Sequence, residues 1–122
     1  MTPWAILAMF ASWLPAAATV PEPIRAAVEY VESRSDPLAV SSCGCVGLMQ
    51  VCPRWSLVER EQLWDESVNR LEGARILADN LHASGGVWRR ARAGYRCGGR
   101  GLRGECGATY ARRVLTIARK MR

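Results

Sequence analysis

The stretch VESRSDPLAVSSCGCVGLMQVCP, residues 31–53, decides how this chain folds. It begins near the end of an expected short helix, because apolar residues recur at helical spacing over residues 24–31. Asp36 and Pro37 should end this helix, since the residue before a proline avoids the helical region. Glu32 then lies at the edge of the apolar face, where partial desolvation favours the protonated form of a carboxyl group near neutral pH.

Beyond residue 53 the chain shows further helical patterns and no sustained strand alternation. Helices are expected over residues 55–63, 67–82, 87–95 and 108–121. Asp65 has the position of an N-cap for the second of these, and the Ser-Gly-Gly run at residues 84–86 should stop it. Residues 97–107 read as a glycine-rich loop. The sequence therefore predicts an all-α domain, with a minor irregular ribbon in its loops.

The start of the chain has the character of a secretory leader. An apolar run over residues 4–14 is too short to span a bilayer, which needs about 20 residues, and the alanines at residues 16–18 fit a cleavage pattern. No Lys or Arg precedes the run, so an uncleaved anchor or a helix packed on the domain stays open. We expect a signal peptide or apolar leader over residues 1–18 and one domain over residues 19–122. Export to the periplasm or cell envelope follows.

Five cysteines are dense for a chain of 122 residues. Their spacings lack the paired pattern of a zinc site, so we expect disulfides, no metal and no cofactor. Cys97 and Cys106 bracket the glycine-rich loop, which buries little apolar surface, and a bridge between them would close it. Cys52 should pair with either Cys43 or Cys45, which leaves one thiol over.

The charge of the chain is +6, and it is concentrated near the C-terminus. Residues 89–122 contain eleven basic residues against one acid, Glu105, whereas the preceding part is net acidic. Such a basic region attracts nucleic acid, anionic lipid headgroups or an anionic cell wall. A solvated arginine face without a partner is the alternative.

Four blocks of the sequence together resemble a known enzyme family. Residues 31–53 resemble the signature of lytic transglycosylases, the goose-lysozyme-like enzymes that cut peptidoglycan glycan strands. Three later blocks fit in order: DESVNRLEGARIL at residues 65–77, AGYRCG at residues 93–98 and YARRV at residues 110–114. The resemblance spans residues 24–117 and implies a small lysozyme-like helical domain with disulfide-braced loops.

The resemblance makes Glu32 the catalytic acid. Most glycosidases use two carboxylates, and no second one accompanies it: Asp36 belongs to a turn, Asp65 to a cap, and Glu29 should face solvent. A lone acid suits the transglycosylase route, in which it protonates the oxygen between MurNAc and GlcNAc. It then takes the proton of the MurNAc 6-hydroxyl, which closes a 1,6-anhydro ring without water. The substrate supplies its own nucleophile.

The same resemblance implies a set of substrate contacts. They are Ser33, which could also position the acid, and Ser41, Gly47, Met49, Gln50, Tyr95 and Tyr110. A plain core role is an equal expectation for Met49. Two positions depart from the family pattern: Arg96 replaces an asparagine and Ile76 an aromatic residue. Arg96 would pair with peptide-stem carboxylates or simply lie on the surface.

These observations predict a monomeric peptidoglycan lytic transglycosylase, suited to phage lysis, wall entry or a secretion machine. A hydrolysing muramidase is the alternative within enzymes, and a non-catalytic glycan-binding or virion module is the alternative outside them. The expected partner is the glycan strand, with the basic C-terminal third holding the protein on an anionic wall or membrane surface. Nucleic acid is not expected as a partner.

Overall fold

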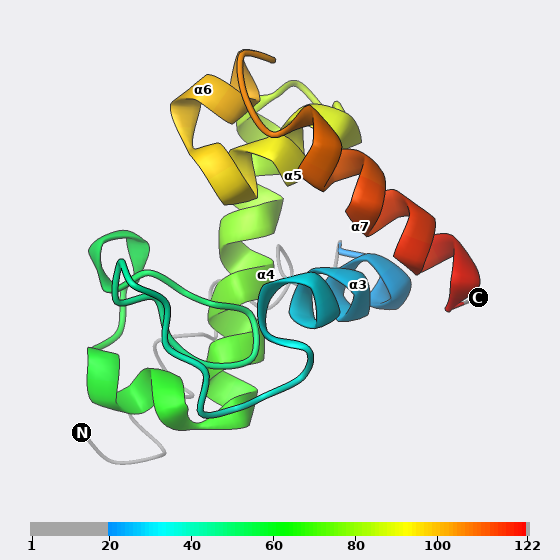
Figure 1. The fold of residues 1–122 in the computed structure, drawn as a ribbon. Coiled ribbons are helices and arrows are strands. Elements are labelled where there is room, and N and C mark those ends of the chain that lie inside the picture. The colour runs from blue at the N-terminus through cyan, green and yellow to red at the C-terminus, as the bar shows by residue number, and fades with distance from the viewer. Residues whose placement is uncertain (1–19, 122) are drawn as a thin grey trace.

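Helices dominate the computed structural model, which describes residues 20–121 (Figure 1). The elements are α3 (Glu22–Ser33), η1 (Pro53–Trp55), η2 (Arg60–Trp64), α4 (Glu66–Ala83), α5 (Trp88–Cys97), α6 (Gly99–Leu102) and α7 (Ala108–Lys120), where η denotes a 3₁₀ helix. In this part of the chain the only strand-like pairings are two isolated bridges, Val40 with Val46 and Val46 with Val51. The prediction of an all-α domain with a minor ribbon is confirmed.

Helix α4 runs through the middle of the molecule (Figure 1). Helix α5 packs on α4, α6 and α7, and α7 runs back to pack along α3. The loops of residues 34–52, with η1 and η2, lie at the other end of α4. This arrangement brings the C-terminal helix beside the first one, so residues from both can share a site.

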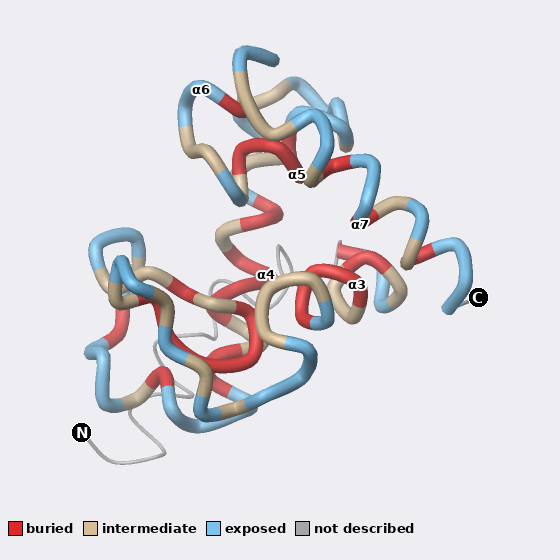
Figure 2. The backbone as a smooth tube through the Cα atoms, viewed as in Figure 1, coloured by how far each residue is buried: buried red, intermediate tan, exposed pale blue. Residues whose placement is uncertain are grey.

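The core lies between α3, α4, α7 and the loop of residues 46–51 (Figure 2). Its largest fully buried apolar side chains are Met49, Leu63 and Leu77. Helix α3 contributes Ile24, Ala27 and Val28 to the buried side, as the helical spacing predicted. Burial of this face stabilises the position of α3 against α4 and α7.

The first helix ends earlier than expected. It ends at Ser33, three residues before Asp36, because Arg34 and Ser35 adopt left-handed backbone angles, with φ of 53° and 62°. The Arg34 N–H donates to the Tyr30 carbonyl oxygen at 2.8 Å and closes the last turn. The predicted stop at Asp36 and Pro37 is therefore wrong.

Two of the later expectations also need correction. The single helix expected over residues 55–63 is wrong, because the chain is extended between η1 and η2. Ser56 bonds locally to Val58, and Glu59 starts η2 through a capping box with Gln62. The glycine-rich loop of residues 97–107 contains α6, one turn of helix. In contrast, α4 begins at the predicted cap: Asp65 accepts from the Val68 N–H at 3.0 Å.

Two disulfides brace the loops. Cys97 pairs with Cys106, as predicted, and Cys52 pairs with Cys45, which decides between the two partners left open. Cys43 is exposed and has a free thiol. The expected leader over residues 1–18 lies outside the described residues. Between residues 20 and 121 no helix combines the length and apolarity needed to cross a bilayer.

Candidate active site

Glu32 lies in the last turn of α3, facing α7. Its side chain is only 8% exposed, and its Oε2 accepts a hydrogen bond of 2.9 Å from the Tyr110 hydroxyl. The Arg96 Nη1 lies 3.7 Å from Oε1. Burial raises the pKa of Glu32, while the Tyr110 hydrogen bond and the Arg96 charge act in the opposite direction. The carboxyl group can therefore hold a proton at a higher pH than an ordinary glutamate.

Packing of α7 on α3 brings Tyr110 to the acid. Tyr110 is in the first turn of α7, with its ring beside α3, and the Arg96 guanidinium lies 6.0 Å from the centre of that ring. Arg96 comes from the end of α5 and its side chain is 62% exposed. The acid is thus held by one buried hydroxyl and one solvent-facing cation.

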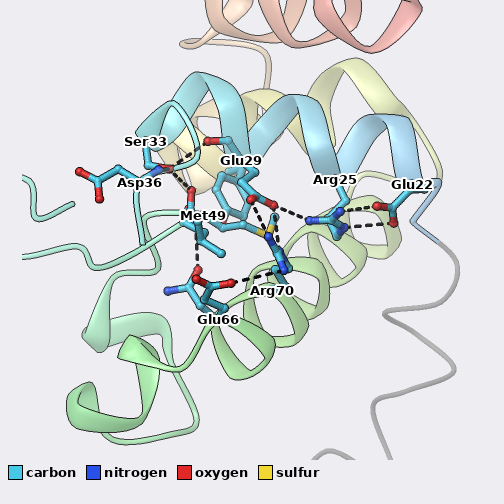
Figure 3. A network of polar contacts seen from close by, with 11 residues as sticks. Glu22, Arg25, Glu29, Ser33, Asp36, Met49, Glu66 and Arg70 are labelled. Atoms are coloured by element: carbon cyan, nitrogen blue, oxygen red, sulfur yellow. Dashed lines mark hydrogen bonds and ion pairs between the residues drawn. The ribbon is translucent and has the colours of Figure 1, made fainter. Parts of the chain in front are cut away.

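Ser33 ties the end of α3 to the neighbouring loop. Its hydroxyl donates to the Leu48 carbonyl oxygen at 2.6 Å and lies 3.2 Å from the Glu29 carbonyl oxygen, while the Asp36 N–H donates to it at 3.2 Å (Figure 3). These contacts hold the left-handed turn that follows α3. The residue next to the acid therefore has a positioning contact.

The GLMQV loop is held on α4 by Asn69. The Asn69 Oδ1 accepts from the Met49 N–H at 2.8 Å, and its Nδ2 donates to the carbonyl oxygens of Val46 at 2.8 Å and Leu63 at 2.9 Å. Gly47 has φ of 77°, and a Cβ there would lie 2.4 Å from Asn69 Nδ2. Close approach of the loop to α4 therefore requires glycine at this position.

Tyr95 contacts the same loop from α5. Its hydroxyl donates to the Met49 carbonyl oxygen at 2.7 Å, and burial raises the pKa of Tyr95 well above its usual value. The Met49 side chain is fully buried in the core. Tyr95 is thus bonded to the loop that contains Gly47 and Met49. The same loop is bonded to Ser33, the residue next to the acid.

Gln50 and Ser41 make their contacts inside the loop. The Gln50 Nε2 donates to the carbonyl oxygens of Ala39 and Gly47, both at 3.0 Å. The Ser41 hydroxyl oxygen accepts from the Cys45 N–H at 3.1 Å. Both side chains are partly exposed. They brace a loop whose surface lies next to the end of α3.

The expectation that Glu29 faces solvent is wrong. Glu29 is buried, and its carboxylate accepts from Arg25 at 2.6 Å and from Arg70 at 3.0 Å (Figure 3). Arg25 also pairs with Glu22. Burial pushes the pKa of Glu29 upward, but the hydrogen bonds and charges of Arg70 and Arg25 bring it below the usual value. Glu29 is therefore an ionised structural residue.

The sequence analysis missed a further buried carboxylate, Glu72. Its Oε1 accepts from the Leu57 N–H at 3.0 Å and from Arg75 at 2.6 Å, and Arg75 also pairs with Asp79 at 2.7 Å. Glu72 and Arg75 stand three residues apart on α4, a spacing that could have revealed the pair. This network attaches the segment between η1 and η2 to α4.

Among residues 20–121, no group of three or more His, Cys, Asp or Glu side chains could hold a metal ion. The described residues form a small helical domain with disulfide-braced loops, in which the partly buried Glu32 carboxyl lies beside the Tyr110 hydroxyl. The class that this fold and site define is a small all-α domain with an acid next to a tyrosine.

Comparison with protein families matches residues 15–114 to the family described as Transglycosylase SLT domain, and the chain belongs to that family. Comparisons with curated proteins and with solved structures gave no match. Membership implies a transglycosylase activity that cleaves peptidoglycan, with peptidoglycan as the substrate bound. Such a substrate and the two disulfides favour action outside the cytoplasm.

Proposed function

We propose that the protein is a lytic transglycosylase that cleaves the bond between MurNAc and GlcNAc and forms 1,6-anhydro-MurNAc, with Glu32 as its one catalytic carboxyl group. The observation that carries this proposal is the environment of Glu32: a buried carboxyl whose pKa is raised by burial and whose Oε2 is held by Tyr110. The other two buried carboxylates, Glu29 and Glu72, are each occupied by arginine partners.

The proposed reaction uses Glu32 twice. Its proton passes to the glycosidic oxygen while the bond from that oxygen to C1 of MurNAc breaks, which leaves a carboxylate on the enzyme. The 6-hydroxyl of the same sugar then attacks C1 and gives its proton to that carboxylate. The acid is regenerated, no water is consumed, and the product carries the anhydro ring.

Tyr110 and Arg96 support the charge that develops between these two steps. The Tyr110 hydroxyl donates to Oε2, and the positive charge of Arg96 lies near Oε1, so both favour the carboxylate over the acid. Burial acts in the opposite direction. This balance lets one group serve first as acid and then as base.

The proposed sugar contacts come from three helices, α3, α5 and α7, and from the loop of residues 41–50. They are Ser33, Ser41, Gly47, Met49, Gln50, Tyr95 and Tyr110. Since the Met49 side chain is fully buried, its proposed contribution is support of the loop from below. Ser41 and Gln50 are partly exposed and would offer polar atoms to the glycan.

The basic C-terminal third is proposed to hold the enzyme on an anionic wall or membrane surface. Arg112, Arg113 and Arg119 are exposed on α7, and the only acid from residue 89 onward, Glu105, already pairs with Arg103. Association through this region should weaken as salt is added. Export by a leader over residues 1–18, a monomeric state and a role in phage lysis or a secretion machine remain proposals as well.

Mass spectrometry of fragments released from purified peptidoglycan tests the proposal. Transglycosylation gives anhydro-MurNAc ends, which are one water lighter than the reducing ends that a hydrolysing muramidase leaves. Glu32→Gln should lower the rate of release about 10²–10⁴-fold, the usual contribution of a general acid. Glu61→Gln, the same change at an exposed residue of η2, should leave it unchanged. Reducing ends, or release by folded Glu32→Gln at the native rate, would refute the proposal.

A further inference from the structure

Helices α5 and α6 and the start of α7 meet at one end of the molecule (Figure 1), and a cavity of 370 Å³ lies between them. The volume falls in the range of about 300–1,000 Å³ that is usual for small-ligand sites. Three arginines line the cavity: Arg89, Arg90 and Arg103. None of its lining residues is a partner of Glu32 or a proposed sugar contact. The cavity therefore has no part in the proposed reaction.

Two of these three arginines have no counter-ion. Arg89 and Arg90 are exposed, and neither has an ion pair or a side-chain hydrogen bond within residues 20–121. Arg103 pairs at 2.8 Å with Glu105, the only acid from residue 89 onward. Positive charge without compensation is thus concentrated at Arg89 and Arg90, where it favours binding of an anion.

A buried cation adds to this charge. Arg92, which precedes the cavity-lining Ala93, is 5% exposed, and its Nε donates to the Ala111 carbonyl oxygen at 3.1 Å. It has no ion pair in the described part of the chain. Burial lowers the pKa of Arg92, and the charges of Arg119 and Arg89 lower it further. A buried charge without a counter-ion costs free energy, which an anion bound near Arg89 would offset in part.

The shape of the cavity is built into the fold. Gly101 of α6 packs so closely on α5 that a Cβ there would collide with the Ala93 carbonyl group. The disulfide between Cys97 and Cys106 closes the loop that carries this turn of helix. The space in front of the arginines is therefore present before a ligand arrives, which lowers the cost of binding.

We propose that this cavity binds a phosphate monoester group through Arg89 and Arg90. Guanidinium groups match the oxygen atoms of phosphate in bidentate pairs. A phosphate monoester carries about two negative charges at neutral pH, whereas a carboxylate carries one, so it compensates two unpaired cations more fully. Such a group belongs either to a lipid headgroup or to a soluble compound. Because no step of the proposed reaction uses these residues, the site stands whether or not Glu32 acts as proposed.

Titration with inorganic phosphate, followed by NMR at constant ionic strength, tests the site. The double variant Arg89→Gln/Arg90→Gln is compared with Arg112→Gln/Arg113→Gln, which removes the same charge from the exposed side of α7. In the native protein, the amide signals of Ala93 and Gly104 should shift to saturation, since both residues line the cavity. The first variant should bind at least about tenfold more weakly, because it loses charge-assisted hydrogen bonds. The control should keep the native affinity.

Three results would overturn the proposal. They are the absence of saturable shifts at the cavity, equal weakening in the two double variants, and an affinity for acetate equal to that for phosphate. Equal weakening would mean that phosphate meets only the general positive charge of the C-terminal third. Equal affinity for acetate would mean that the two unpaired arginines do not select a dianion.

Sedimentation with vesicles identifies the source of the phosphate group. Vesicles of phosphatidylcholine with an equal part of phosphatidic acid, whose headgroup is a phosphate monoester, are compared with phosphatidylcholine alone. If a headgroup is the source, the native protein binds the mixed vesicles, inorganic phosphate displaces it at constant ionic strength, and Arg89→Gln/Arg90→Gln weakens binding more than the control does. If vesicle binding is absent, or falls equally in both double variants, the phosphate that binds in the cavity is that of a soluble compound.

Discussion

Asn69→Ala should destabilise the domain strongly. Asn69 is 1% exposed and is the side chain that attaches the GLMQV loop to α4. Its removal separates the loop that carries Met49 from the helix below it. Because Tyr95 bonds to the Met49 carbonyl oxygen, the surroundings of the acid should loosen as well.

The magnitude follows from the groups that lose a partner. The Met49 N–H and the Leu63 carbonyl lose their bonds to Asn69, whereas the Val46 carbonyl still accepts from Val51 at 3.0 Å. A buried polar group left without its partner costs about 1–3 kcal/mol, so the two losses lower the free energy of unfolding by about 2–6 kcal/mol. The whole free energy of unfolding of a domain of this size is about 5–15 kcal/mol, so this loss would be a large part of it.

Thermal unfolding followed by circular dichroism checks this prediction. A loss of that size should lower Tm by at least about 8 °C. Asn80→Ala is the matched control, since it makes the same change on the same helix, and both variants gain the same helix propensity. The Asn80 amide nitrogen has no partner to lose, so the control should change stability by less than about 1 kcal/mol. Equal shifts in the two variants would refute the reasoning.

Two further predictions concern the acid and a disulfide. Because burial raises the pKa of Glu32, the folded state holds this proton above the ordinary value of 4.5, and stability is lost as pH rises through the raised pKa. The Tm of Glu32→Gln should therefore equal that of the native protein near pH 4 and exceed it at pH 7. A difference in Tm that does not change with pH would contradict this. Replacing Cys97 and Cys106 by alanine should cost about 2–3 kcal/mol in chemical unfolding, whereas Cys43→Ser should cost nothing. Unchanged stability of the double variant would show that the bridge between Cys97 and Cys106 does not stabilise the domain.

Local signals in the sequence predicted most helices correctly. Asp65 caps α4 as its position indicated, and the apolar spacing of residues 24–31 placed the buried face of α3. The end of α3 was not predictable in the same way. Arg34 and Ser35 adopt left-handed angles that neither residue favours, and the contact of Ser33 with Leu48 helps to hold that turn.

The assignment of Glu32 as the catalytic acid stays a prediction, whereas the prediction for Glu29, one turn before it, was wrong. Glu32 and Glu29 stand on the same short helix, and spacing along the chain placed Glu29 towards solvent. Arg70, which lies 41 residues away, pairs with it instead. Helical periodicity describes which residues share a face, but it contains no information about which distant cation meets a given carboxylate.

The sequence by itself determined the helical class and the bridge between Cys97 and Cys106, because these depend on residue type and local spacing. Only the tertiary structure decided what surrounds the carboxyl group of Glu32. Packing of α7 on α3 brings Tyr110 to within 2.9 Å across 78 residues of chain. The physical reason is that the environment of a buried group is created by burial itself, when segments far apart in the chain exclude water together.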